Sequence, residues 1–302
     1  MLVTGKRMSP EILHRAIVRN PRHLKVLDCD LMTFDPLGPE YFRVDPQLPT
    51  ILGVRHLNLC TTRISDEDAA KLVGMMPELR SLEFGGNQIG GGTLSAIAGC
   101  KKLQCLSLKM VKGIEVEGFE TMLHECNMLK VLDMGWTCNR PKFKSEGSVP
   151  CSKDCNDPAG PHGMCAAHFA VTHAIESIAR NCGQLEHLDF SGCREYVNDG
   201  HVEILVAGCT NLKTLDLSDS YTLTNKAANS IMKHLEQLEY LALSRCHRIE
   251  IGLIKELAVM EGLRCIQLYG CYPQIDEQLK EAKKHCSFNN NKLCQLRFDT
   301  FN

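Results

Sequence analysis

The sequence lacks the features that would assign it to several common functional classes. Its formal net charge at pH 7 is −2 and its pI is near 6.6, so it has no charge excess of the kind that binds nucleic acid or an anionic membrane. No apolar run approaches the ~20 residues that span a bilayer. The first residues, Met1–Arg7, lack the apolar region of a signal peptide. We therefore expect an intracellular location, nuclear or cytoplasmic.

Signatures of catalysis are also missing from the sequence. It shows no Ser/His/Asp arrangement, no P-loop and no pair of carboxylates in the context of a cleft. We therefore expect a binding protein and not an enzyme, and we expect no cofactor.

The sequence does contain a unit of 24–27 residues that recurs along most of its length, with a core that reads Leu-x-x-Leu-x-Leu. Leucine-rich units of this kind stack into a solenoid in which each repeat contacts its neighbours. Each unit is long enough for a strand and a helix. The predicted fold is therefore an α/β leucine-rich-repeat solenoid, a horseshoe with a parallel sheet on its concave side and helices on its convex side. Clear copies begin at Leu79, Leu103, Leu129, Leu185, Leu212, Leu238 and Leu263, with weaker copies at residues 24–27 and 54–59.

Helix-like apolar spacing follows most of the strands. It predicts helices over residues 66–75, 118–126, 169–182, 200–208, 225–235 and 251–260. In the third of these, Ala170, Ala174, Ile175 and Ile178 define the expected buried face. Plausible N-caps are Ser65, Asn198 or Asp199, and Thr224.

Two segments interrupt the repeat and set the predicted domain boundaries. Residues 1–50 form an N-terminal capping repeat with an irregular, proline-containing loop. Residues 51–286 hold the repeats, with an inserted polar loop at 139–165, and residues 287–302 form a C-terminal tail. Insertions in repeat proteins map to loops on one face, often the binding face.

Cysteine is abundant, with 17 residues, but the positions argue against disulfides. Cys100, Cys126, Cys182 and Cys209 each lie three residues before a strand-opening leucine. Other repeats place Met or Leu there, so the position requires a medium-sized buried apolar group. Cys193, Cys246 and Cys271 share a second position, five residues after the middle apolar residue of the strand. The odd number and regular spacing favour reduced, buried thiols.

The inserted loop contains the one candidate metal site. Its possible zinc ligands are Cys151, Cys155, His162 and Cys165. Zinc sites use short Cys/His spacings, but this spacing matches no standard finger. A mobile loop without metal is therefore the favoured interpretation.

One candidate binding surface is a row of carboxylates on the concave side. Asp133, Asp189 and Asp216 follow the middle leucine of three consecutive repeats, and neighbouring strands lie about 4.8 Å apart. The row could attract a basic partner. Alternatively, each Asp accepts a local hydrogen bond, as is common in such repeats.

A second candidate row lies four residues after the middle apolar residue of each strand and contains Trp136, Asp219 and Arg245. Trp136 is the single tryptophan, in a position that Gly192 and Gly270 fill elsewhere. Trp and Arg are enriched among interface hot spots, so Trp136 is either an anchor for a partner or a side chain that packs beneath the insertion.

Two weaker candidates, Arg194 and Tyr269, lie on the same side as this second row. An arginine here suits a carboxylate or phosphate through its bidentate fork. The alternative is an intramolecular pair with Asp216 or Asp219.

Longer stretches of the repeats carry a more specific resemblance. Residues 211–220, 241–246, 132–138 and 188–194 resemble the leucine-rich-repeat F-box proteins of the S-phase kinase-associated type. The resemblance implies a substrate-recognition subunit of a cullin-type (SCF) ubiquitin ligase, which binds a phosphorylated cell-cycle regulator together with a small cyclin-kinase-subunit accessory protein. It further implies that Asp219 and Arg245 contact the substrate and the accessory protein.

The sequence departs from that family in two respects: no Leu-Pro-x-Glu opening of an F-box precedes the repeats, and the insertion at 139–163 has no recognised counterpart. The Skp adaptor and the cullin are therefore expected as partners only if an F-box is supplied. The alternative interpretation is a repeat-only interaction scaffold or inhibitor that uses the acidic row.

Overall fold

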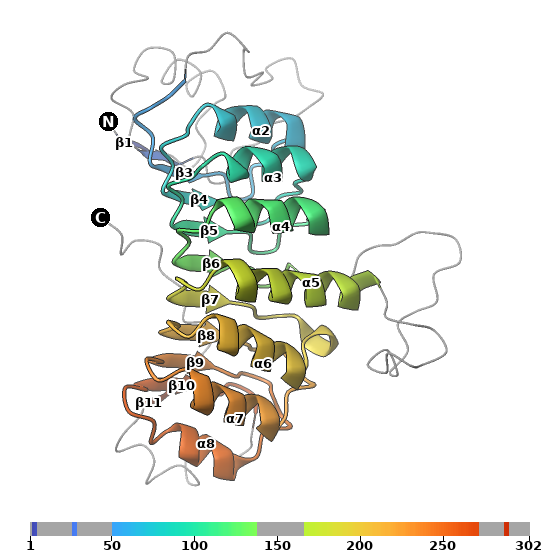
Figure 1. Cartoon of the computed structure of the whole chain (residues 1–302), viewed down its shortest axis with the longest axis vertical. Helices are drawn as coiled ribbons and strands as arrows, with labels where there is room; N and C mark the ends of the chain where they lie inside the picture. Colours follow the sequence, from blue (N-terminus) through green and yellow to red (C-terminus); the bar gives the residue numbers. More distant parts are fainter. Residues whose placement is uncertain (1, 5–25, 29–49, 138–165, 272–286, 290–302) are drawn as a thin grey trace. The chain divides into compact units, whose positions relative to one another are not determined.

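The computed structural model describes residues 2–4, 26–28, 50–137, 166–271 and 287–289. The chain divides into two compact units. Unit 1 comprises Met1–Thr137, Gln184–Asp189 and Cys294–Asn302, and unit 2 comprises Cys138–Gly183 and Phe190–Leu293. Figure 1 labels the helices and strands of both units.

Unit 1 contains a parallel sheet in which each strand pairs with the next along the chain. Helices follow β3, β4 and β5, and they lie along one side of the strands (Figure 1). This is the alternation that the leucine spacing predicts. The elements are β1 (Leu2–Thr4), β2 (Val26–Asp28), β3 (His56–Asn58), α2 (Asp66–Gly74), β4 (Ser81–Glu83), α3 (Gly91–Ala98), β5 (Cys105–Ser107), α4 (Val116–Glu125), β6 (Val131–Asp133) and β7 (His187–Asp189).

Unit 2 repeats the same plan, with parallel pairing of β8 with β9, β9 with β10 and β10 with β11. A short 3-10 turn, η1, precedes α6. The elements are α5 (Ala166–Asn181), η1 (Arg194–Tyr196), α6 (Asp199–Gly208), β8 (Thr214–Asp216), α7 (Asn225–His234), β9 (Tyr240–Ala242), α8 (Ile251–Leu257), β10 (Cys265–Gln267) and β11 (Ser287–Asn289). Strand and helix alternate as expected of an α/β leucine-rich-repeat solenoid.

Rows of apolar side chains between strands and helices form the core of each unit. The middle strand residue is buried in every repeat from β3 to β10: Leu57, Leu82, Leu106, Leu132, Leu188, Leu215, Leu241 and Ile266. Burying one such side chain contributes about 1.5–3 kcal/mol, so stacked repeats supply the stability that a single unit lacks.

The cysteines occupy this core as the sequence predicts. Both predicted positions are buried, and all ten cysteines in the described part of the chain are free thiols. Burial raises the pKa of Cys126 and of Cys209 to about 12. These thiols therefore remain protonated and unreactive near neutral pH.

Capping side chains connect neighbouring helices. Ser65, Asn198 and Thr224 each accept a backbone N–H in the first turn of their own helix, which confirms the predicted N-caps and selects Asn198 over Asp199. Asp199 instead bonds the next repeat, where its carboxylate accepts from Thr224 N at 2.8 Å and from Thr224 Oγ1 at 2.6 Å.

Helix α3 was missed by the spacing analysis, because Gly91 and Gly92 weaken the pattern. Its first turn is capped from the neighbouring helix, where Asp66 Oδ1 accepts from Gly90 N at 2.6 Å and from Thr93 N at 3.1 Å. Burial alone would raise the pKa of Asp66, but the bonds from Thr93, Gly90 and Gly92 together lower it.

The buried face of α5 differs from the predicted one. Val171, Ile175 and Ile178 point into the core, whereas Ala174 is half-buried beside them. The side chain of Ala170 lies outside the described residues, as do the N-terminal loop, the inserted loop at 139–165 and most of the C-terminal tail.

Candidate protein-binding surface

A row of left-handed turns marks the end of every strand from β3 to β10. Each of these residues lies four positions after the middle strand residue and has φ between +55° and +80°. We call these residues the left-handed turn row. They are Thr61, Gly86, Met110 and Trp136 in unit 1 and Gly192, Asp219, Arg245 and Gly270 in unit 2.

Hydrogen bonds between repeats explain this shared backbone conformation. Met110 N donates to Gly135 O at 2.8 Å. Asp219 N likewise donates to Ser244 O at 2.8 Å, and Arg245 N donates to Tyr269 O at 2.9 Å. Glycine adopts positive φ without cost, whereas other residues do so rarely and at a cost of about 1–3 kcal/mol. The non-glycine members therefore occupy costly positions at the rim of the sheet.

In unit 1 two members of this row, Met110 and Trp136, carry large apolar side chains. Met110 is 51% exposed and Trp136 is half-buried. Backbone bonding holds the turn that carries Met110 against the turn of the next repeat, which carries Trp136. Large apolar side chains at an exposed, strained position are typical anchors for a partner protein.

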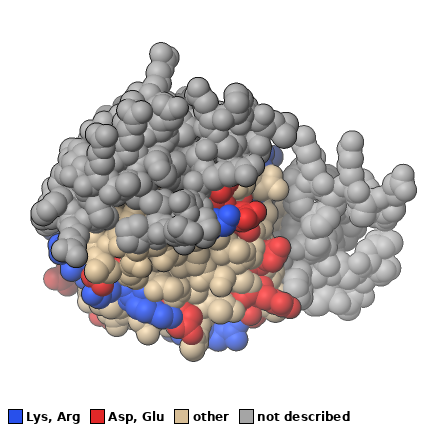
Figure 2. All heavy atoms as spheres, turned by 90° about the horizontal axis from the view of Figure 1, so that it is seen from above, with Lys and Arg blue, Asp and Glu red and all other residues tan. Residues whose placement is uncertain are grey.

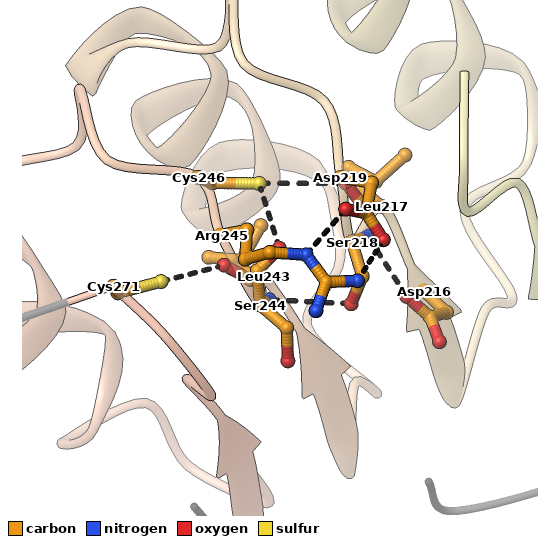
Figure 3. Close-up of polar contacts among 9 residues, drawn as sticks. All are labelled: Asp216, Leu217, Ser218, Asp219, Leu243, Ser244, Arg245, Cys246 and Cys271. Carbon is orange, nitrogen blue, oxygen red and sulfur yellow. Dashed lines mark hydrogen bonds and ion pairs between the residues drawn. The ribbon is translucent and has the colours of Figure 1, made fainter. Parts of the chain in front are cut away.

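In unit 2 the row carries a charged pair. Arg245 forms a bidentate ion pair with Asp219, in which Nε donates to Oδ1 and Nη2 donates to Oδ2 (Figure 3). The side chain of Asp219 is 4% exposed, whereas that of Arg245 is 36% exposed. Its guanidinium carbon lies 5.9 Å from the centre of the Tyr269 ring, within the range of a cation–π contact.

This geometry sets the electrostatics of the pair. The hydrogen bond to Asp219 raises the pKa of Arg245 above its usual value. Since both bonds use Nε and Nη2, Nη1 lacks an acceptor among the described residues. One edge of the guanidinium is thus fixed, and the other edge is available to an oxyanion or carbonyl of a partner.

Two serines beside this pair have unused hydroxyl groups. Ser220 is completely buried and Ser244 is 4% exposed. The Oγ atom of neither residue has a hydrogen-bond partner in the described part of the chain. Buried polar groups nearly always form hydrogen bonds. The hydroxyl groups of Ser220 and Ser244 are therefore unsatisfied donors among the described residues, and they lie next to Asp219 and Arg245 in the sequence of these turns.

Two of the three aspartates in the predicted acidic row are buried and do not form an exposed acidic surface. Asp133 and Asp189 are register partners on β6 and β7, but both side chains are buried. Asp133 Oδ1 accepts from Gly135 N at 3.0 Å and its Oδ2 accepts from Ser107 Oγ at 3.2 Å. Lys109 Nζ lies 3.6 Å from Asp189 Oδ2.

The local bond at Asp133 recurs along the strands. In unit 2, Asp216 Oδ1 accepts from Ser218 N at 2.8 Å, and in unit 1 Asn58 Oδ1 accepts from Cys60 N at 2.9 Å. An Asx side chain that accepts the N–H two residues ahead stabilises a turn. The local role considered for these aspartates is therefore present at Asp133 and Asp216.

Burial gives Asp133 an unusual titration. Desolvation, followed by the neighbouring carboxylate of Asp189, raises the pKa of Asp133 to about 6. The group is therefore partly protonated near neutral pH.

Other candidates are more dispersed. Arg194 is exposed in η1 and makes no ion pair among the described residues. Its possible partner Asp219 is engaged by Arg245. The zinc candidates Cys151, Cys155, His162 and Cys165 lie outside the described residues, and no group of metal ligands occurs within them.

Sequence reasoning missed that the turn row has a single backbone conformation throughout. Gly86, Gly192 and Gly270 at equivalent positions are the signal that could have revealed it, because recurrent glycine indicates positive φ. The unsatisfied hydroxyls of Ser220 and Ser244 left no recognisable signal.

Comparison with known proteins shows what these repeats are similar to. A generic leucine-rich-repeat profile matches residues 77–98, and the chain is a leucine-rich-repeat protein. The profile of the SKP2 LRR domain matches residues 163–300, a stretch that contains Asp219, Arg245 and Tyr269. The repeats of this stretch are thus similar to the SKP2 LRR domain, which supports a role in protein interaction.

One of two similar solved structures shares the fold, at low sequence identity, and the other has a lower TM-score. An internalin of Listeria monocytogenes, InlF, is 16% identical with a TM-score of 0.52, covering 91% of this chain and 70% of that one. The yeast Rad7 and Elc1 complex gives 14% identity and a TM-score of 0.47, and the match covers 95% of this chain. This chain spans 59% of the matched chain in that complex. None of the helices in the described ranges is long and apolar enough to cross a membrane.

Proposed function

We propose that this chain is the substrate-recognition repeat domain of a cullin-type ubiquitin ligase. It binds a phosphorylated cell-cycle regulator, together with a small cyclin-kinase-subunit accessory protein, and presents the regulator for ubiquitination and degradation. The observation that carries the proposal is the SKP2-type match over residues 163–300, combined with the half-exposed fork of Arg245 at the rim of unit 2.

The chemistry of the site supports this assignment. The free edge of Arg245 can donate to a carboxylate or phosphate, and Tyr269 offers an aromatic surface beside it. Asp219 fixes the guanidinium in place before binding, which lowers the entropy cost of recognition. The ubiquitin transfer belongs to the partner enzyme, and this chain contributes positioning. A nuclear or cytoplasmic location accords with this role.

Affinity purification of the chain from its own cells, followed by mass spectrometry, tests the proposal. We expect recovery of a phosphoprotein that is lost after phosphatase treatment, together with the accessory protein. The Skp adaptor and cullin are expected when the purified protein includes an F-box. Reproducible partners that are insensitive to phosphatase, with adaptor and cullin absent from every preparation, would instead indicate a repeat-only scaffold.

A further inference from the structure

Two arginines of unit 1 occupy equivalent positions on neighbouring repeats. Arg55 immediately precedes β3 and Arg80 immediately precedes β4, and the next residues, His56 and Ser81, are register partners. Arg80 N donates to Arg55 O at 2.8 Å. The two side chains therefore originate about one strand spacing, ~4.8 Å, apart.

Neither guanidinium has a partner in the part of the chain that the structure describes. Both residues are exposed. The carboxylate of Glu78 interacts electrostatically with both arginines, but its hydrogen bonds come from Lys102, whose Nζ donates to its two oxygens at 2.8 Å and 2.7 Å. Arg55 and Arg80 thus lie on neighbouring strands, and neither forms an ion pair with a carboxylate of the described residues.

The equivalent positions before two other strands of unit 1 hold residues of opposite charge. Lys130 and Glu186 occupy the corresponding sites of β6 and β7, and their charged atoms lie 2.9 Å apart. Opposite charges at neighbouring positions satisfy each other there. The Arg55–Arg80 end differs because like charges are adjacent.

Nearby titratable groups respond to this positive field. Burial lowers the pKa of His56, and the charges of Arg55 and Arg80 lower it further. The pKa of Glu78 is lowered mainly by its bond to Lys102, with smaller contributions from Arg55 and Arg80. On the face drawn in Figure 2, basic and acidic side chains lie interspersed along the lower edge.

We propose that Arg55 and Arg80 form a second recognition site, in unit 1, for the oxyanion of an acidic peptide segment. Two guanidinium forks at this spacing suit one side-chain phosphate, which accepts bonds from both, or a pair of adjacent carboxylates. The site is separate in composition from the Asp219–Arg245 pair and does not depend on a ligase role.

A peptide partner fits better than a nucleic acid. Nucleic-acid sites use extended basic surfaces that neutralise many phosphates, whereas this site has two unpaired arginines in a chain of net charge −2. The occupant we assign is therefore a short, locally acidic segment of a protein.

The test measures fluorescence anisotropy of labelled peptides with the full chain at low ionic strength. The probes share a Gly/Ala background and carry one phosphoserine, a Glu-Glu pair or a single serine. We expect the phosphoserine or Glu-Glu peptide to bind better than the serine peptide. Arg55→Ala and Arg80→Ala should each weaken that binding about tenfold or more, the size expected for loss of a charge-assisted bond.

Two controls separate recognition from general effects. Arg264→Ala removes an exposed arginine from the equivalent position of unit 2 and should leave binding unchanged. Glu78→Gln removes a nearby negative charge and should strengthen binding, which a purely structural role would not produce. The losses caused by Arg55→Ala and Arg80→Ala should persist when Arg245 is also replaced by Ala, so failure here and failure of the proposed ligase function are distinguishable.

The relative affinities of the phosphoserine and Glu-Glu peptides assign the natural source of the oxyanion. Equal binding of all three peptides, or no effect of Arg55→Ala and Arg80→Ala, would overturn the site. Tighter binding of a single-stranded oligonucleotide that is lost in the same two variants would overturn the peptide assignment. Arg55→Ala, Arg80→Ala and Arg264→Ala change exposed side chains, and circular dichroism checks that every variant remains folded.

Discussion

The left-handed turn row has one backbone conformation in both units but opposite side-chain chemistry. Unit 1 presents Met110 and Trp136, which are large and apolar. Unit 2 presents Asp219 and Arg245, which form a charged pair. The backbone bonds between repeats are alike in the two units. The repeat therefore fixes where the side chains are displayed and leaves their chemistry to vary, as repeat binding proteins require.

The largest expected change in stability comes from substitutions that break the Asp219–Arg245 ion pair of unit 2. Arg245→Ala leaves the buried carboxylate of Asp219 without its partner, and we expect a loss of about 3 kcal/mol in the free energy of unfolding. Asp219→Ala leaves a half-exposed cation that water can solvate, and we expect a loss of about 1–2 kcal/mol. Denaturant titration of both variants measures the asymmetry.

The two substitutions are therefore expected to weaken partner capture partly through stability. The double variant Asp219→Gly with Arg245→Gly removes both charges and relieves two strained turns. It should be more stable than Arg245→Ala alone. If Asp219→Ala proved the more damaging single change, the buried-carboxylate argument would be incorrect.

A second prediction concerns the buried acid of unit 1. Asp133 has a folded-state pKa of about 6 against an ordinary value of 3.8, so the folded state holds its proton more tightly than the unfolded state. This group therefore favours folding below pH ~4, and its contribution falls as the pH rises through about 6, by about 3 kcal/mol in all.

Asp133→Asn keeps an oxygen acceptor for Gly135 N and removes the charge beside Asp189. We expect the variant to exceed the natural chain in stability by about 3 kcal/mol at pH 7.5 and to match it near pH 4. Urea unfolding at the two pH values tests this. A variant less stable than the natural chain at pH 7.5 would show that the carboxylate is net stabilising.

The smallest expected effects come from the turn backbone itself. Gly270 has φ of +70°, and a Cβ there would lie 3.1 Å from Arg245 Cγ. We expect Gly270→Ala to destabilise the protein by about 1 kcal/mol, whereas Met110→Gly should be neutral or stabilising by a similar amount. Thermal unfolding compares the two. Equal effects of both changes would mean that positive φ carries no cost in this row.

Much of the fold was predictable from the sequence, because the leucine spacing specifies one buried residue per strand and fixes the strand register. The buried thiols followed from a position that Cys, Met and Leu share. Helix α3 was not predictable, since its glycine-rich start depends on capping by Asp66 from the neighbouring helix. Local spacing carries no information about such contacts between repeats.

The candidate site was predictable in its residues but not in its energetics. The sequence singled out Asp219 and Arg245, and it raised an intramolecular pair as an alternative. Whether Asp219 bonds Arg194 or Arg245 depends on the direction in which the side chains leave the turn. That direction follows from the backbone angle φ of the turn residues and not from residue type. The burial of Asp133 and Asp189 likewise depends on packing in three dimensions.

The most direct test of the account uses the double variant Asp219→Gly with Arg245→Gly in the phosphatase-controlled capture experiment. Glycine preserves the left-handed turns and leaves no orphaned charge, so the chain should unfold within about 1 kcal/mol of the natural protein. We predict that it loses the phosphatase-sensitive partner, while Arg264→Ala retains it. Undiminished capture by the folded double variant would contradict the assignment of partner recognition to the Asp219–Arg245 pair.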